Sequence, residues 1–249
     1  MKRPFLNLCG LALLTCTFSL PSCNDDNNND LYYPSALVTV KPSIDNSSFY
    51  LQLDDNTTLA PTNMKVSPFG KKEVRALVNY TLDDQAETSP HSRAVRINWI
   101  DSILTKPLAA NLGNMNEKTY GDDPVEIIND WVTIAEDGYL TLRFRTRWGY
   151  GVKHTINLVP SAEKEQPYKV RLYHNAKSDL AGRIGDALVA FRIKSTATQT
   201  ENSSDTENIV DLILEWKSYS GIKTATFKYR VPKEPVTGIT EGSFVKMLD

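Results

Sequence analysis

The chain has 249 residues, of which 41% are hydrophobic and 23% are charged, and its formal net charge at pH 7 is −2. This composition is that of a globular protein, and the length suits one large domain or two small ones. Because binding to nucleic-acid phosphates needs a basic surface, the acidic balance disfavours a nucleic-acid partner.

The first 22 residues have the pattern of a secretory signal peptide. Lys2 and Arg3 form a basic start, and a mostly apolar run extends from Phe5 to Leu20. A transmembrane helix needs about 20 consecutive apolar residues. The interrupted run is too short for that, so we expect residues 1–22 to be a cleaved signal peptide.

The residues directly before Cys23 resemble the lipobox of bacterial lipoproteins. Leu20 supplies the apolar residue three positions before the cysteine, and Ser22 supplies the small residue beside it. A thiol at this position can take a diacylglyceryl group, and the new amino terminus can take an acyl chain such as palmitate. Each buried methylene contributes about 0.8 kcal/mol, so several chains hold a protein on a bilayer. Cys23 is therefore the predicted lipidation site; the alternative is an ordinary signal peptide that contains a cysteine.

The other two cysteines, Cys9 and Cys16, lie in the segment that would be removed. The mature chain then keeps no thiol for a disulfide, a zinc site or a catalytic nucleophile. We expect no metal and no cofactor.

Residues 23–34 are expected to form an acidic tether between the lipid and the folded protein. The stretch NDDNNND is too polar to bury itself. Asp25 and Asp26 also resemble the acidic export signal that takes some lipoproteins to the outer leaflet of the outer membrane, although the usual form has Ser or Lys where Asn24 stands. The expected location is the outer membrane, and both a surface-exposed and a periplasm-facing anchor remain open.

The first half of the folded region shows the two-residue alternation of strands. A polar loop is expected over 83–92. Short strands without a long helix favour a small barrel over 35–115, with the domain boundary in the Pro-, Gly- and Asn-rich segment that surrounds residue 115. The predicted strands are 35–41, 49–55, 72–82 and 93–104.

The second half, 116–249, predicts a seven-stranded antiparallel β-sandwich. Turns are expected at 136–138, at WGYG (148–151) as a hairpin, and at GRIG (182–185), and an exposed loop over 196–207. The run 208–218 could instead be helical for one or two turns. The predicted strands are 131–134, 139–148, 152–160, 168–175, 186–195, 208–218 and 223–232.

Histidines and carboxylates give no catalytic pattern. His91 lies in the polar loop, whereas His154 and His174 become neighbours if the strands around them pair. A metal site would need at least one more ligand nearby, and no further His or Cys is available for it. The acidic pairs fall in turn-like contexts where aspartate is common. No catalytic residue is predicted, and we expect the protein not to be an enzyme.

The run RFRTRW is the most suggestive binding feature. Alternation places three arginines on one face, opposite Phe144: Arg143, Arg145 and Arg147. Beside Trp148 and Tyr150, these groups could bind an anionic glycan or an acidic surface of a partner protein. The alternative is a solvated strand face paired with acidic neighbours. The candidate ligand-binding residues are Trp148, Tyr150 and Arg145.

The lipobox, the acidic tether and the central segment DPVEIINDWVTIAEDGYLTLRFRTRWGYGVKHTINLV together resemble the NigD-like family of lipoproteins. The most specific part is 131–159. The resemblance implies an N-terminal OB-like domain and a C-terminal β-sandwich. It also brings an immunity-type role, suggested for one member in a bacteriocin gene cluster, and it implies no catalytic residues.

Three functional hypotheses follow. The first is a non-enzymatic, membrane-anchored binding or interaction module. The second is an accessory protein that binds glycans at the cell surface. The third is protection of the cell against a secreted toxin or bacteriocin.

Overall fold

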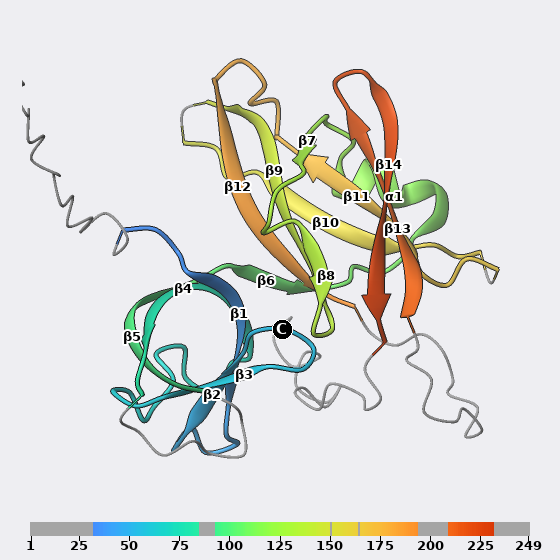
Figure 1. Ribbon diagram of the computed structural model, residues 1–249. Coiled ribbons are helices and arrows are strands. Elements are labelled where there is room, and N and C mark those ends of the chain that lie inside the picture. Colours follow the sequence, from blue (N-terminus) through green and yellow to red (C-terminus); the bar gives the residue numbers. More distant parts are fainter. Residues whose placement is uncertain (1–31, 85–92, 150, 164, 194–208, 232–249) are drawn as a thin grey trace, which may run out of the picture.

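The computed structural model describes residues 32–84, 93–149, 151–163, 165–193 and 209–231. Figure 1 shows an all-β molecule in which an N-terminal barrel lies against one end of a C-terminal sandwich. Several predicted features lie outside the described residues: the signal peptide, Cys23, Asp25, Asp26, His91, Tyr150 and the loop over 196–207.

The N-terminal domain is a closed five-stranded barrel with the order β1-β2-β3-β5-β4. Alternate residues such as Val38, Val40 and Leu51 fill its interior and are fully buried. The predicted OB-like barrel is confirmed in its architecture. Sequence periodicity missed one strand, β3, because it has only four residues and their burial does not alternate. The strands are β1 (Ala36–Pro42), β2 (Phe49–Gln52), β3 (Thr58–Pro61), β4 (Val74–Leu82) and β5 (Arg93–Ser102).

The chain passes from the barrel to the sandwich directly after β5. Strand β6 (Leu104–Pro107) pairs in parallel with β12 of the sandwich. The crossing therefore comes before residue 115, where the sequence placed the domain boundary. The short helices η2 (Gly113–Met115) and α1 (Asn116–Tyr120) follow in the segment that was expected to be irregular.

The C-terminal domain is a sandwich of two sheets. One sheet has the order β10-β11-β13-β14, and the other has the order β6-β12-β9-β7 with β8 paired to β9. The predicted sandwich is confirmed, but the described residues form nine strands rather than seven. The remaining strands are β7 (Glu126–Ile128), β8 (Ile134–Glu136), β9 (Tyr139–Trp148), β10 (Thr155–Pro160), β11 (Lys169–Asn175), β12 (Arg183–Arg192), β13 (Ile209–Ser218) and β14 (Gly221–Arg230).

The prediction of a purely antiparallel sandwich was wrong. Pairs β6–β12 and β11–β13 are parallel. WGYG is not a hairpin turn either, because β9 and β10 belong to different sheets and the chain crosses between them. Whether the chain makes a hairpin or crosses to the other sheet depends on the sheet to which the next strand belongs. The alternation of residues within one strand does not indicate which sheet that is.

Two local expectations also failed. The predicted strand 131–134 is mostly a turn, and β8 begins only at its last residue, Ile134. GRIG is not a turn, because Arg183 already begins β12. Packing explains the glycine at its last residue, Gly185, because a Cβ there would lie 2.7 Å from the indole Cδ1 of Trp148. The predicted turn at 136–138 is confirmed, with Asp137 and Gly138 at positive φ.

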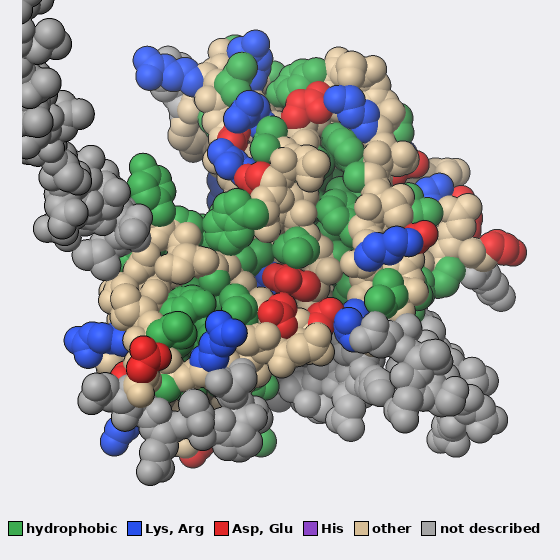
Figure 2. All heavy atoms as spheres, in the orientation of Figure 1, with side chains coloured by type: hydrophobic (Ala, Val, Ile, Leu, Met, Phe, Trp, Pro, Cys, Tyr) green, Lys and Arg blue, Asp and Glu red, His purple; other side chains and the backbone are tan. Residues whose placement is uncertain are grey.

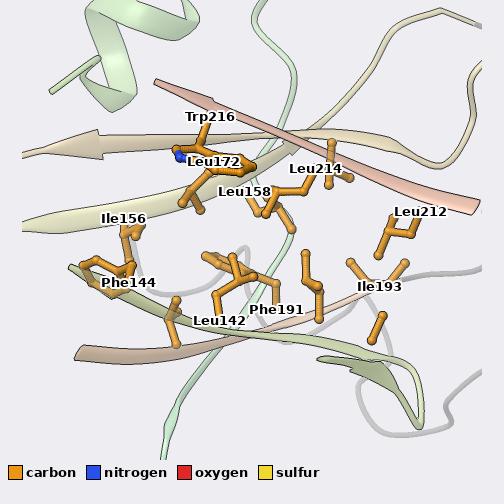
Figure 3. Packing of buried hydrophobic residues seen from close by; sticks show 14 of the residues in the cluster. Leu142, Phe144, Ile156, Leu158, Leu172, Phe191, Ile193, Leu212, Leu214 and Trp216 are labelled. Atoms are coloured by element: carbon orange, nitrogen blue, oxygen red, sulfur yellow. The ribbon is translucent and has the colours of Figure 1, made fainter. Parts of the chain in front are cut away.

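The sandwich core lies between its two sheets, as Figure 3 shows. Leu142 and Phe144 of β9 and Phe191 of β12 face Leu158 and Trp216 from the opposite sheet. The predicted strand 208–218 is confirmed as β13, whose inward-facing residues alternate with more exposed ones. Burial of these large apolar side chains is the main stabilising contribution to a domain without disulfides.

The barrel and the sandwich share a third hydrophobic cluster. Leu37 and Leu77 of the barrel pack against Tyr139 and Ala190 of the sandwich. In Figure 1, the barrel lies next to the end of the sandwich where β6 and β8 are drawn. The contact buries part of the outer face of β9, including Thr141.

A buried arginine also joins the two domains. Arg75 of β4 is fully buried and donates hydrogen bonds to Thr39, Thr141 and the Glu136 carboxylate. Burial raises the pKa of Glu136, and the charge of Arg75 acts in the opposite direction. Lys41 adds an ion pair to Asp137 at 2.7 Å. The junction between the two domains is thus held by apolar contacts and by the ion pairs Arg75–Glu136 and Lys41–Asp137.

Candidate functional site

The outer face of β9 changes character along the strand. Near its start it is covered by the barrel, and further along it presents Arg143 and Arg145 to solvent. The antiparallel register with β12 places Leu188 opposite Arg143 and Asp186 opposite Arg145. Directly opposed residues point to the same face of a sheet, so these four side chains meet just beyond the edge of the barrel.

A turn between β7 and β8 adds an aromatic side chain to this face. The Asp130 carboxylate accepts a hydrogen bond from the backbone N–H of Val132, and Thr133 N–H donates to the carbonyl of Asp130. Thr133 Oγ1 in turn accepts the backbone N–H of Arg143. This bonding pattern holds the turn against β9 and leaves Trp131 54% exposed.

A groove of about 200 Å³ lies at this place. Its walls come from both domains, because Pro34 and Leu77 of the barrel face the turn and β12 of the sandwich. In Figure 2, basic and acidic side chains lie side by side over β9 and β12, above hydrophobic side chains that extend toward the barrel. We call it the junction groove; it is lined by Pro34, Leu77, Asp130, Trp131, Val132, Arg143, Asp186, Ala187 and Leu188.

The charges of the junction groove compensate one another. Arg143 bridges Asp130 at 2.8 Å and Asp186 at 2.7 Å, and Arg145 binds Asp186 at 2.6 Å. Hydrogen bonds from Arg145 and Arg143 hold the pKa of Asp186 at about 2, and the two carboxylates raise the pKa of Arg143. The formal charges of the two arginines and the two aspartates sum to zero.

The structure separates the ligand-binding candidates that the sequence grouped together. Arg145 points outward, as predicted for the arginine face. Trp148 points to the other face, where its ring centroid is 6.1 Å from that of Phe144 and its indole N–H donates to the carbonyl of Gly185. One ligand cannot contact both side chains, because the sheet lies between them. Tyr150 lies outside the described residues.

Trp148 instead belongs to a network of aromatic and polar side chains on the inner face of β9, close to the end of that strand. It stacks on His154 with a centroid distance of 4.5 Å. His154 Nδ1 lies 3.0 Å from His174 Nε2, and His154 Nε2 lies 3.4 Å from the Asp179 carboxylate. The same carboxylate accepts the N–H of Gly149. The two histidines are therefore neighbours, as the sequence predicted, and their network holds the turn after β11.

Each ring nitrogen of this pair can donate or accept a hydrogen bond, according to the tautomer of its ring. The His174 ring also lies against the backbone of Asp123 and Pro124. Burial, followed by the nearby His154, lowers the pKa of His174 to about 4, while Asp123 favours its protonation.

A second hollow of about 240 Å³ lies beside β10 and β11. Lys169 and Arg171 line it, and both form ion pairs with Glu215. Its aromatic residue, Tyr173, is buried and has the Arg171 guanidinium 5.0 Å from its ring centroid. Because that aromatic face is already covered, the junction groove offers the more accessible contact surface.

The described residues contain neither a cluster of metal ligands nor a membrane-spanning helix. No group of three or more His, Cys, Asp or Glu side chains is arranged to hold a metal ion within these ranges. None of the helices there has the length and apolar character needed to cross a membrane.

Two family models together match most of the chain. The NigD-like N-terminal OB domain matches residues 37–103, and the NigD-like C-terminal beta sandwich domain matches residues 107–229. This chain belongs to the NigD-like family. The first family match ends at residue 103 and the second begins at residue 107, which is where the chain passes from β5 of the barrel to β6 of the sandwich. No curated protein matches this NigD-like sequence.

Solved structures support the same assignment. The NigD-like chain is 34% identical to a Parabacteroides distasonis protein named as related to a toxin, with a TM-score of 0.63 and coverage of 78% of this chain and 92% of that one. A Bacteroides vulgatus protein of unknown function is 22% identical, with a TM-score of 0.60 and coverage of 83% and 95%. A NigD-like immunity protein from Bacteroides caccae is 20% identical, with a TM-score of 0.54 and coverage of 78% and 96%. The last two show the fold alone.

Sequence reasoning did not find the central residues of the groove in this NigD-like chain. Trp131 was assigned to a strand, although the preceding Asn129 and Asp130 are residues that favour turns. That pair next to an exposed aromatic was a usable indication of a surface turn. Asp186 had no such indication, because its place beside the arginines depends on the register of β9 and β12.

Proposed function

We propose that this protein is a non-enzymatic, lipid-anchored binding module of the cell envelope, and that its ligand binds in the junction groove. One observation supports the choice of site above the others: a half-exposed tryptophan lies beside a closed ion network in a groove built by both domains. Concave sites at domain contacts with a few well-placed polar groups are the usual form of ligand pockets.

The electrostatics favour binding over catalysis. A general acid or base works best when its pKa lies near the working pH. Asp186 has a pKa of about 2, and its oxygens are held by two arginines, so it is poorly suited to exchange protons at neutral pH. The same fixed charges suit a preformed binding surface, because they need no rearrangement when a ligand arrives.

The anchor is proposed from the amino-terminal sequence. The basic start, the apolar run and the lipobox support lipidation at Cys23, and Asp25 with Asp26 support transport to the outer leaflet. Replacement of Cys23 by Ser is expected to move the protein from the membrane fraction to the soluble fraction. Double replacement of the two aspartates by Ala is expected to reduce cleavage by external protease. Unchanged fractionation, or unchanged cleavage, would contradict the respective part.

Binding is tested with the full-length lipidated protein in liposomes and with separated saccharide and protein fractions of the host envelope. The wild type is expected to retain at least one fraction, and Trp131→Ala is expected to reduce that retention at least tenfold. Ile222→Ala serves as the control, since Ile222 is 55% exposed at the start of β14, outside the groove. Retention that does not depend on Trp131 contradicts the proposed site.

Catalysis is tested separately with the same wild-type protein and a broad panel of glycans and peptides. No turnover is expected. Hydrolysis that is lost in Asp186→Asn or Asp130→Asn would overturn the non-enzymatic part of the proposal, because these carboxylates are the acidic groups of the groove.

Protection against a secreted toxin is the second candidate function. The observation that favours it is the 34% identity to the protein named as related to a toxin, together with a fold shared with a NigD-like immunity protein. Deletion of the gene is then expected to sensitise the cell to a neighbour's secreted product. Unchanged sensitivity across a panel of competitor strains would remove this candidate.

A further inference from the structure

The geometry points to a neutral sugar as the ligand of the junction groove. We infer that one pyranose ring of a neutral glycan stacks on Trp131 while its hydroxyl groups hydrogen-bond to the network of Asp130, Arg143 and Asp186. This inference rests on the proposed function, because it names the chemical class that the same groove takes.

The size of the groove limits what it can hold. A volume of about 200 Å³ is below the roughly 300–1,000 Å³ that pockets for drug-sized ligands occupy. The groove therefore suits a single compact ring, held at one end or along the side of a longer chain.

The groove combines apolar and polar surface, and so does a pyranose ring. A sugar ring presents C–H groups on its face and hydroxyl groups around its rim. Trp131 lines the groove and is 54% exposed, and the face of its aromatic ring carries a negative quadrupole that attracts C–H groups. Leu77 of the barrel and Leu188 of β12 add apolar surface to the groove. Arg143 of β9 and Asp186 of β12 lie beside Leu188 on the sheet, and Asp130 lies in the turn next to Trp131.

The ion network explains why the sugar should be neutral. Two arginines and two aspartates give the groove no net charge, so an anionic group that approaches Arg143 also meets Asp130 and Asp186. A hydroxyl can donate to one group and accept from another without adding charge. Each ionised carboxylate has about four lone-pair sites, so these oxygens can still accept hydroxyl donors beside the arginines.

The arrangement is also rigid, which lowers the entropic cost of binding. The turn that carries Trp131 is tied to β9 through Thr133 and through the ion pair of Asp130 with Arg143. The barrel wall is fixed by Arg75, which reaches Thr141 on the same strand. Pre-formed aromatic and polar walls at a set separation select a ligand by shape as well as by chemistry.

The experiment uses the full-length lipidated protein in detergent micelles on an array that carries both neutral and acidic glycans. We expect binding to one or more neutral glycans, with a dissociation constant that changes less than threefold between 50 and 500 mM NaCl. Trp131→Ala is expected to weaken it at least tenfold, and Trp131→Phe is expected to retain part of it. Arg143→Gln is expected to weaken it, whereas Arg147→Gln, on the same face but outside the groove, leaves it unchanged.

Each other outcome overturns the inference. Binding of acidic glycans alone, lost at 500 mM NaCl, shows an anion site. No glycan binding, or neutral-glycan binding that Trp131→Ala leaves intact, rejects the sugar class or its place. Failure of the sugar class is distinguishable from failure of the proposed function: retention of an envelope protein fraction that depends on Trp131 keeps the groove and replaces its ligand.

Discussion

The two faces of β9 hold the same kinds of side chain in opposite circumstances. On the outer face, Trp131 lies beside arginines and aspartates in an open groove. On the inner face, Trp148 lies beside two histidines and an aspartate that are largely shielded from water. The strand supplies residues to both places, and its alternation decides which side chain meets solvent.

Burial gives these two groups different roles. Exposed ion pairs contribute little to stability, typically about 0–1 kcal/mol, so the outer network can serve binding at small cost. Buried polar groups are costly without partners, and the hydrogen bonds of the inner network fix the turn after β11. A tryptophan next to charged groups is therefore evidence for a ligand site only when its face is accessible.

The largest effect is expected from the charge that joins the domains. Arg75→Met leaves the Glu136 carboxylate without its buried partner, which should lower the free energy of unfolding by about 3–5 kcal/mol. Chemical denaturation measures this change. In Arg75→Met/Glu136→Gln the buried charge is absent, so a large part of the loss should return. An equal loss in both variants would show that the ion pair is not the cause.

The inner network predicts a dependence of stability on pH. The pKa of His174 is about 4 in the folded protein and 6.5 in the unfolded chain, so the unfolded state takes up the proton first. The stabilising contribution is complete above pH 6.5, is lost as the pH falls toward 4, and amounts to about 3 kcal/mol at most. Denaturation midpoints between pH 7.5 and 4 measure it.

His174→Gln is the matching control for that series. The Gln side-chain amide can donate or accept a hydrogen bond at His154 Nδ1 but does not titrate in this range. The decline between pH 6.5 and 4 should therefore become shallower in the variant. An unchanged slope would assign the pH dependence to other groups, such as the carboxylates.

A smaller effect on stability is expected on the outer face. Arg143→Gln removes ion pairs to Asp130 and Asp186 from a side chain that is 40% exposed. The expected loss is about 1 kcal/mol. Arg147→Gln should stay within about 0.5 kcal/mol because, among the described residues, Arg147 makes only one long hydrogen bond, to the carbonyl of Gly182. A loss of several kcal/mol in Arg143→Gln would show that the network is structural.

The sequence was sufficient for the all-β class and for the outward direction of the arginines, because both follow from two-residue alternation. It did not give the number of strands in the sandwich or its two parallel pairs. It was insufficient for the groove. The run from Trp131 to Ile134 has the composition of a strand, yet the Asp130 carboxylate binds the N–H of Val132 and turns the chain. The position of Asp186 depends on strand register, and the placement of Leu77 depends on how two domains meet. Such relations arise only in three dimensions.

The most direct test of the difference between the two faces is the pair of melting temperatures of Trp131→Ala and Trp148→Ala. Trp148→Ala removes a packed indole with its stacking and hydrogen-bond partners, which should cost about 3 kcal/mol and lower the melting temperature by about 6–12 °C. Trp131→Ala should change it by less than about 2 °C, since an exposed side chain contributes within about 0.5 kcal/mol. Equal losses in both variants, or a larger loss in Trp131→Ala, would contradict the assignment of the outer face to binding and the inner face to stability.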